Sequence, residues 1–274
     1  MLELLQVRRR QAQERPWKLN LGAGKGWQAA TAHDAAHGAL HRNRAVNDWV
    51  GKWLCGFDLH AYRSYHLQHH RFVQQAEDPD LVLSAPFPIS RASLWRKVAR
   101  DLSGQTFFKQ KFGAYFAPLP PAGGTTRWAL VATQARRQHL FLLSNALGLA
   151  LFAAAGLGWA WVLMWLLPMA TWLPLISRLR NISEHALVAV DEPDPLHHAR
   201  TTKANFWERI FIAPYWVNYH CEHHMFTQIA CWQLPRAHRI LQRQGATARM
   251  TLAPGYLTLL KQASSAGRLP PASA

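Results

Sequence analysis

The run from Leu140 to Ser177 contains no charged side chain, and this is the strongest constraint on how the chain can fold. One unbroken helix over it would be roughly 57 Å long, almost twice the ~30 Å of a bilayer's hydrocarbon core. Gly156-Leu157-Gly158, near its middle, is typical of a turn. We therefore predict a membrane-embedded helical hairpin over residues 140–177. The alternative is a hairpin buried inside a soluble protein.

Basic residues stand on both sides of this run: Arg136, Arg137 and His139 before it, and Arg178 and Arg180 after it. Two crossings return the chain to its starting side, and positively charged flanks favour the cytoplasm. Tryptophans lie near the expected interfaces, as in an aromatic belt, at Trp128, Trp159, Trp161 and Trp172. The net charge of +16 would suit either nucleic acid or an anionic membrane. Together with the hairpin it favours an integral membrane protein with no nucleic-acid partner.

The remaining sequence predicts an all-α protein whose helical cap lies in the cytoplasm. Residues 1–26 are basic and carry no apolar signal segment, so we expect them to be poorly ordered, ahead of one domain over 27–262 and a disordered tail over 263–274. Residues 90–102 predict an amphipathic helix at the membrane surface or on the protein surface, and 117–124 a loop. Three widely spaced cysteines without a CxxC pair argue against a disulfide framework or a zinc finger.

Histidines cluster at three places in the chain. His33 and His37 form an HxxxH pair, and two HxxHH triplets follow, one at His66, His69 and His70 and one at His220, His223 and His224. Spacings of three and four residues place imidazoles on one face of a helix. Eight imidazoles at such spacings indicate metal binding, and they exceed the capacity of a single ion, so two ions are expected.

The predicted topology brings the three clusters to one side of the membrane. No apolar span separates the first two clusters, and two crossings return the third to the same face. Imidazole suits several transition metals, but the HExxH pattern of zinc peptidases is absent. A redox pair of irons beneath the membrane fits these observations best.

These motifs resemble the histidine boxes of the membrane-bound fatty acid desaturase and hydroxylase superfamily. The resemblance extends to Asp78-Pro79-Asp80 after the second box, to the NYHxEHH form of residues 218–224, and to the LPxxH form of residues 234–238. Asn181 and His185 match an Asn/His pair that follows the last membrane span in this family. The similarity runs from about residue 32 to residue 241.

Position by position, the resemblance implies a set of iron ligands: His33, His37, His66, His69, His70, His185, His220, His223 and His224, with Asn181 joining through a water. His185 would otherwise be an ordinary lone histidine. Asp34, Glu184 and Glu222 lie inside the boxes and are candidates to orient the imidazoles, although they could equally be plain surface carboxylates. The other histidines have no cluster and are interpreted as structural or solvated: His41, His60, His139, His197, His198 and His238.

The activity implied by the resemblance is an oxygen-dependent oxidation by two ferrous ions that introduces a double bond into a lipid acyl chain. A ferredoxin- or cytochrome b5-like protein would supply electrons. A carotenoid ketolase or hydroxylase, or another lipid hydroxylase, is the enzymatic alternative. The resemblance also places two further spans ahead of the first box, for which the 32 residues before His33 leave no room. We therefore expect the N-terminal transmembrane hairpin to be missing, which leaves a truncated, inactive protein with a metal site as another alternative.

Overall fold

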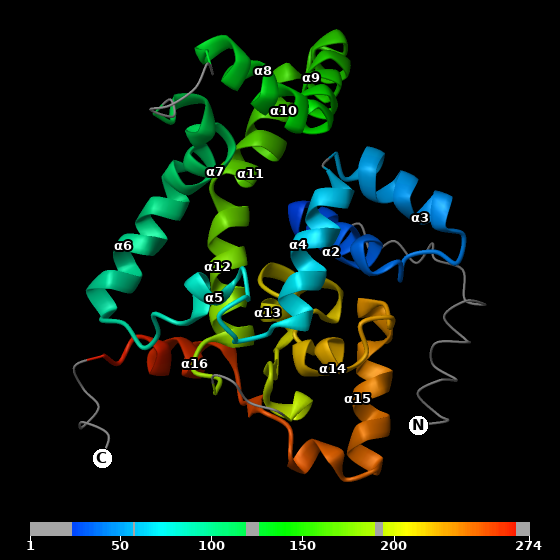
Figure 1. Cartoon of the computed structure of the whole chain (residues 1–274), viewed down its shortest axis with the longest axis vertical. Coiled ribbons are helices and arrows are strands. Elements are labelled where there is room, and N and C mark those ends of the chain that lie inside the picture. The colour runs from blue at the N-terminus through cyan, green and yellow to red at the C-terminus, as the bar shows by residue number, and fades with distance from the viewer. Residues whose placement is uncertain (1–23, 57, 119–125, 190–193, 267–274) are drawn as a thin grey trace.

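The computed structural model describes residues 24–56, 58–118, 126–189 and 194–266, and these residues are mostly helical (Figure 1). The helices of the first half are α2 (Gly24–His37), α3 (Arg44–Trp49), a π-helix (Val50–Leu54), α4 (Leu59–Arg71), α5 (Leu81–Ser84), α6 (Arg91–Leu102), α7 (Gln105–Phe116) and α8 (Arg127–Arg137). The predicted helical class is confirmed.

The second half continues with α9 (His139–Ala154), α10 (Gly158–Trp161), a π-helix (Val162–Leu166), α11 (Leu167–Ala170), α12 (Trp172–His185), α13 (Phe206–Phe211), α14 (His220–Met225), α15 (Leu234–Arg243) and α16 (Tyr256–Ala263). Short 3-10 turns lie at Pro195–His197, Pro214–Trp216, Cys231–Gln233 and Ala246–Ala248. The strands of the described residues, β1 (Thr201–Thr202) and β2 (Leu252–Ala253), form one parallel pair.

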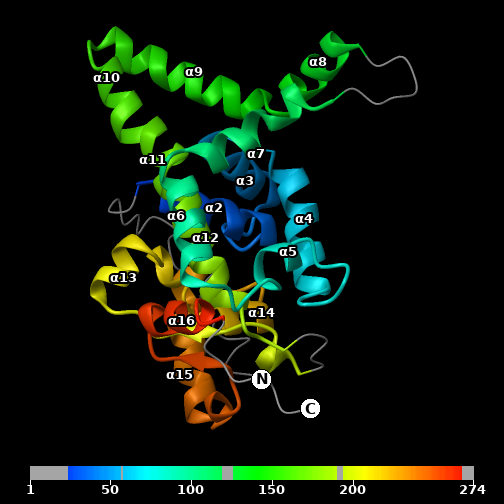
Figure 2. The same cartoon turned by 90° about the vertical axis from the view of Figure 1, so that its left-hand side faces the viewer.

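The uncharged run folds as two helical arms that meet at the expected turn. Gly156 has a φ of +72°, in the left-handed region that favours glycine, and the chain reverses there between α9 and α10 (Figure 2). From Gly158 to His185 the second arm is long and apolar enough to cross a membrane, whereas α9 is apolar but shorter. The break in the helix confirms the turn predicted from the sequence, and the double crossing of the membrane stays a prediction.

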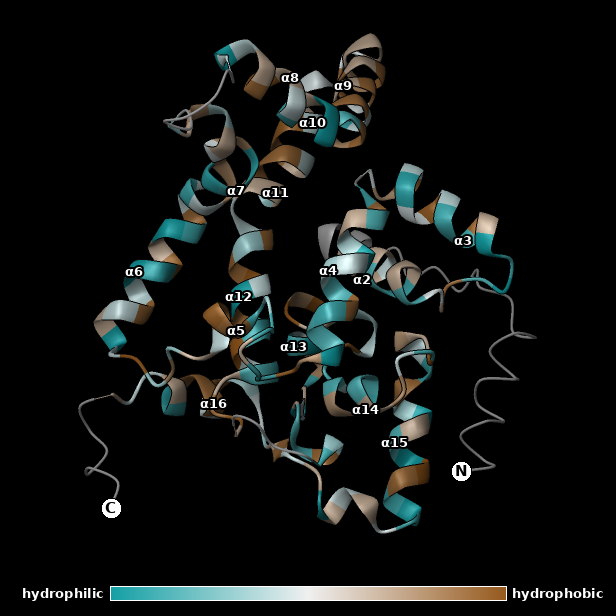
Figure 3. Ribbon diagram, in the orientation of Figure 1, coloured by the Kyte–Doolittle hydropathy of each residue, from teal (hydrophilic) through white to brown (hydrophobic). Residues whose placement is uncertain are grey.

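Hydrophobic residues make up much of the two arms, which carry much brown in the hydropathy-coloured ribbon (Figure 3). Several large ones on the two arms are exposed: Leu143, Leu147, Leu151, Trp159, Leu163 and Met164. Exposed apolar surface of this kind marks an interaction site on a water-soluble protein and is ordinary on a protein that faces lipid. The distribution therefore supports membrane contact for α9, α10 and α11.

The two arms pack together through Gly148 and Trp161, where a Cβ added to the glycine would fall on the indole ring. We expect Gly148→Ala to lower the free energy of unfolding by about 1–3 kcal/mol, because overpacking forces side chains or backbone to shift. Gly113→Ala on α7 is the control, since its new Cβ would meet only Lys109 Cγ at 3.8 Å. Thermal unfolding in detergent measures both, and equal stability of the two variants would contradict the packing.

The end of α2 is held firmly against α4. Ala35 and Leu59 are buried where the two helices meet. Arg63 of α4 donates from Nε to the Ala36 carbonyl at 2.8 Å and from Nη2 to the Ala35 carbonyl at 3.0 Å. The buried Asn47 also donates to the Ala35 carbonyl, at 2.8 Å. These bonds set the first histidine box against the second.

The C-terminal end of α12 is held by hydrogen bonds from the loop that follows α4 and from the segment that pairs with the start of α14. Buried Arg200 donates from Nη1 to the Ala186 carbonyl at 2.8 Å. The two residues after it pair with the segment ahead of α14: Thr201 forms a β-bridge with Tyr219, and the Thr202 N–H donates to the Asn218 carbonyl at 3.0 Å. From the other side, Gln74 Nε2 donates to the His185 carbonyl at 3.0 Å. These hydrogen bonds fix the position of His185 relative to the second and third histidine boxes.

The amphipathic segment 90–102 forms α6, which Ser90 caps by accepting from the Ser93 N–H at 3.2 Å. Leu94 packs against the cluster of Ile182, Ala186 and Ala263, while Trp95 points outward with 70% exposure. At its far end, the fully buried Asp101 is paired with the guanidinium of Arg178 on α12. The helix thus lies on the protein surface against α12, and contact with headgroups stays a prediction for its outer face.

Two predicted segment boundaries differ from the structure. The sequence predicts poor order for residues 24–26, but these residues form the first turn of α2; residues 1–23 lie outside the described residues. The disordered tail was placed from residue 263, yet Ala263 is fully buried and the Ala266 N–H donates to the Ile89 carbonyl at 3.1 Å. Contacts with the 87–94 region hold these last residues, and such long-range pairing leaves no local sequence signal. Most of the predicted loop, 119–124, also lies outside the described residues.

Candidate metal centre

All nine histidines that the family resemblance singled out converge below the apolar arms. They come from four helices: His33 and His37 from α2, His66, His69 and His70 from α4, His185 from α12, and His220, His223 and His224 from α14. Their ring nitrogens form two groups in which every donor atom lies within 4.8 Å of the others. The first group is His33, His37, His66, His70 and His223, and the second is His69, His185, His220 and His224.

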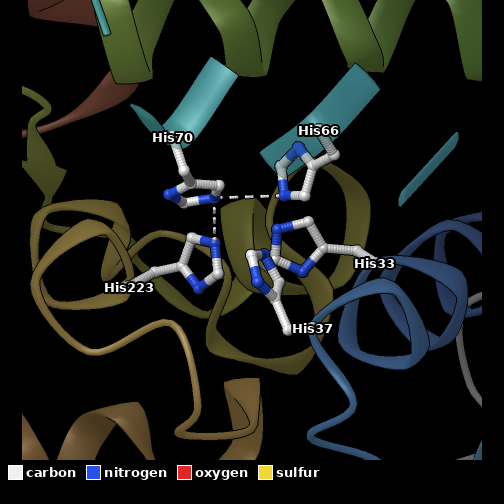
Figure 4. A group of neighbouring side chains, drawn as sticks. All are labelled: His33, His37, His66, His70 and His223. Atoms are coloured by element: carbon white, nitrogen blue, oxygen red, sulfur yellow. Dashed lines mark hydrogen bonds between the residues drawn. The ribbon is translucent and has the colours of Figure 1, made fainter. Parts of the chain in front are cut away.

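The first group joins α2, α4 and α14 around one point (Figure 4). His70 Nε2 lies 3.2 Å from His66 Nε2 and 3.0 Å from His223 Nε2. His33 and His37 close the opposite side, with ring centroids 4.3 Å and 4.8 Å from that of His223. Three sequence segments far apart in the chain therefore present their imidazoles to a common centre.

The second group repeats this arrangement with α4, α12 and α14. His220 Nε2 lies 2.9 Å from His185 Nε2 and 3.1 Å from His224 Nε2. The His69 ring completes the group, 4.7 Å from His185 and 5.1 Å from His224 between centroids. The two groups are neighbours, because the His70 and His224 rings are only 4.1 Å apart.

The nitrogen positions fit a shared cation better than hydrogen bonds between rings. One ring nitrogen carries either one proton or one lone pair, so His70 Nε2 and His220 Nε2 cannot each satisfy two neighbouring nitrogens by hydrogen bonding. In addition, His33 Nε2 and both nitrogens of His37 are buried without a hydrogen-bond partner. Nitrogens bound at about 2.1 Å to one ion and about 90° apart lie about 3.0 Å from each other, close to the separations observed.

Burial keeps at least five of these imidazoles in the neutral form that a metal requires. Desolvation lowers the pKa of His37 to about 2, and repulsion from neighbouring His33 and His69 adds to the effect. Desolvation, followed by charge repulsion within the cluster, also places the pKa values of His66, His220, His223 and His224 well below the usual value. Each of these five rings therefore offers a lone pair at neutral pH.

Two carboxylates contact the Nδ1 atoms of histidines from outside the two groups, those of Asp78 and Asp34. Asp78 Oδ1 accepts from His69 Nδ1 at 2.8 Å, and the side chains of both residues are almost fully buried. Asp34 Oδ1 lies 3.4 Å from His33 Nδ1, and its second oxygen accepts from the Cys231 N–H at 3.1 Å. A carboxylate on Nδ1 holds the proton there and directs the Nε2 lone pair into the group. Asp78 thus orients His69, with the shortest such contact.

Glu184 and Asn181 lie on α12 beside His185. Glu184 Oε2 is 3.7 Å from His220 Nε2, and its other oxygen accepts from Arg180 Nη2 at 2.8 Å. Asn181, one turn before His185, has a buried Oδ1 without a hydrogen-bond partner. A partnerless amide oxygen at this place is compatible with the water-mediated role that the resemblance implies, which stays a prediction.

The predicted role of Glu222 differs from what the structure shows. Glu222 is fully buried, but its oxygens accept from Thr201 Oγ1 and contact His238 Nδ1 instead of orienting one of the nine histidines. His238, interpreted from sequence as structural or solvated, is the ring that Glu222 holds. The cause is the packing of α15 against α14, which presents His238 to the side of α14 that faces away from the metal groups.

Asp78, the first residue of the DPD motif, orients a histidine although its spacing predicts no such role. Its position depends on the loop after α4, where Gln74 takes a positive φ and its N–H donates to Asp78 Oδ2 at 2.9 Å. That loop folds the carboxylate back onto His69, nine residues earlier. The feature of the sequence that could have indicated this role is that Asp78 is an acidic residue shortly after the second histidine box.

Comparison with known proteins identifies the class to which this fold and site belong. The model of the fatty acid desaturase family matches residues 16–255, most of the chain. The chain belongs to the fatty acid desaturase family, which confirms the resemblance. Proteins of this family are membrane-associated, use a di-iron centre and are oxidoreductases of the desaturase type.

Two characterised relatives are similar over much of their length. Dihydrorhizobitoxine desaturase of Bradyrhizobium elkanii is 26% identical over 253 residues, covering 87% of this chain and 70% of the relative. The sn-1 oleoyl-lipid 12-desaturase of Arthrospira platensis is 25% identical over 227 residues, covering 74% of this chain and 60% of the relative. The chain therefore spans less than two thirds of the second relative. No solved structure matches the chain significantly.

Proposed function

We propose that this protein is an oxygen-dependent desaturase that holds two irons in its histidine groups and introduces a double bond into a lipid acyl chain. The observation that carries the proposal is the convergence of nine imidazoles, six of them on buried residues, into two adjacent groups. When bound there, a pair of irons supplies the chemistry that reduces O2 and removes hydrogen from an unactivated C–H bond.

The protein's own residues hold and shield this centre. The first group would hold one ion and the second group the other, with Asp78 and Asp34 keeping protons on the outer nitrogens of His69 and His33. Burial of the rings excludes bulk water from the centre, which protects a strong oxidant from side reactions. Imidazole ligands bring no negative charge, so these residues would leave the positive charge of two bound ions largely uncompensated.

The overall reaction balances with an external electron donor. One O2, two protons and two electrons, together with the two hydrogens removed from adjacent carbons, give one double bond and two water molecules. A ferredoxin- or cytochrome b5-like protein is the proposed donor. The topology proposed from the sequence places the centre on the cytoplasmic face, where such carriers are found.

The names of the two relatives favour desaturation over ketolation or hydroxylation, because both are called desaturases. They differ in substrate, since only one is named for an acyl lipid. The name of the other relative is a reason to test dihydrorhizobitoxine as the second candidate substrate. Carotenoids are the third.

Product analysis tests the proposal. Full-length protein, loaded with iron in membranes and supplied with O2 and a reducing system, should convert saturated or monounsaturated acyl chains to products 2 mass units lighter. The matched control is His220→Ala, which removes the nitrogen shared by His185 and His224. Products 16 mass units heavier would favour a hydroxylase. Iron-loaded protein that oxidises no lipid, carotenoid or small-molecule substrate would contradict the proposal.

A further inference from the structure

A second site lies on the side of α14 that faces away from the two histidine groups. It is a partly enclosed cavity of about 240 Å³ between β1, the Pro214–Trp216 turn and α15. The side chains that matter in it are Lys203, Arg209, Trp216, Tyr219 and His238. In Figures 1 and 2, α14 and α15 lie toward the opposite end of the molecule from α9, so the cavity is remote from the proposed membrane surface.

A continuous series of side chains connects this cavity to the helix that carries the third histidine box. The Trp216 and Tyr219 rings are 6.3 Å apart between centroids, and the Tyr219 and His238 rings 5.1 Å apart. His238 contacts Glu222, which lies between His220 and His223 on α14. The cavity is therefore the outer end of a short, packed route to the metal ligands.

The charge around the cavity is positive. Lys203 is exposed, and Arg209 lies over the Trp216 ring, 4.7 Å from its centroid. Exposed Arg239 follows His238 on α15 and, with Arg209, acts electrostatically on Tyr219. No carboxylate lines the cavity within the described part of the chain. Nearby Glu208 is engaged in the capping box of α13, where it accepts from the Asn205 N–H at 2.9 Å.

We propose that this cavity is the docking site of the electron donor, an acidic one-electron carrier protein. The proposal rests on the proposed function and names the partner for the same centre. Complementary charge suits a carboxylate-rich carrier, and the aromatic route gives its electron a short path inward. Each docking oxidises the carrier by one electron and reduces the site by one, so two dockings supply the two electrons of one turnover.

The test measures docking itself as well as activity. An acidic plant-type [2Fe–2S] ferredoxin is titrated onto the full-length protein in nanodiscs of neutral lipid at low ionic strength. We expect Lys203→Glu/Arg239→Glu to weaken binding at least 10-fold. The matched control Arg42→Glu/Lys261→Glu reverses two exposed charges that do not line the cavity, and should stay within 2-fold of the unmodified protein. Zero-length carbodiimide coupling should join Lys203 to a ferredoxin carboxylate.

Several outcomes would overturn the docking proposal: equal weakening by both double variants, binding independent of salt, or no ferredoxin binding to protein that desaturates with a chemical reductant. Saturable binding of inorganic phosphate, lost in Lys203→Glu/Arg239→Glu, without ferredoxin binding would assign the cavity to a small anion instead. Failure of the proposed function is distinguishable from these, because it appears as absence of iron or of product in the unmodified protein, whatever the ferredoxin binds.

Discussion

Replacing His223 with alanine is expected to abolish desaturation, lowering product formation by more than about 100-fold. His223 is the residue through which α14 reaches the first histidine group, and its Nε2 lies 3.0 Å from His70 Nε2. The ring is 2% exposed, so neither water nor another described side chain can readily take its place. The measurement is product per chain together with iron per chain, and we expect the variant to retain about one iron of two.

The control for this experiment is His60→Ala on α4. His60 lies on the same helix as His66, His69 and His70 but is exposed and belongs to neither group. Its replacement should leave iron content and most activity intact. Comparable losses in the two variants would mean that the histidines act through the stability of the helices, which would contradict the assignment of His223 as a ligand.

The second large effect is expected for Asp78→Asn, which should lower the affinity of the second group for its ion by about 10–100-fold. The carboxylate holds the proton of His69 on Nδ1 and aims Nε2 at the group. An amide can present its nitrogen to the ring and carries no charge, so both the orientation and the basicity of His69 are weakened. Competition with a calibrated chelator measures the change.

Glu77→Gln is the matched control, since Glu77 is the exposed neighbour of Asp78. Asp78 also accepts from the Gln74 and Asp80 N–H groups, so loop stability must be measured separately by thermal unfolding of both metal-free variants. A drop in affinity that scales with lost stability, or an equal drop in Glu77→Gln, would show that Asp78 acts only on the loop.

The sequence predicts most of the metal centre because helical spacing is a local property. His66, His69 and His70 share one face of α4, and no knowledge of the rest of the fold is needed to see it. His185 is different: it stands alone on α12, and only the resemblance to a family singled it out. The structure brings it to 2.9 Å from His220, nitrogen to nitrogen, because Arg200 and Gln74 hold that end of α12.

The contacts that escaped prediction depend on loops and on packing between helices. Asp78 reaches His69 through a turn that includes a positive φ at Gln74. His238 reaches Glu222 because α15 packs against α14, and nothing in the spacing of either helix reveals this pair. The tail boundary near Ala263 was misplaced for the same reason, since its burial comes from residues far away in the chain.

The arrangement of the apolar arms was predicted in part. The turn at Gly156 follows from a glycine pair inside a long uncharged run, and the structure breaks the helix there. The length of α9, 16 residues, corresponds to about 24 Å and is shorter than the ~30 Å hydrocarbon core. The sequence pattern therefore predicts where the run breaks, because a glycine turn is local, whereas the unequal lengths of the two arms depend on packing.

The central claim is that two groups of histidines hold two irons, and metal analysis of the purified protein tests it most directly. Elemental analysis combined with Mössbauer spectroscopy of ⁵⁷Fe-loaded protein should give two irons per chain in nitrogen-rich environments. His223→Ala should lower the iron content of the first histidine group, and Asp78→Asn should lower that of the second. A protein that retains no iron when iron is supplied, or that binds a single zinc ion per chain, would contradict the account.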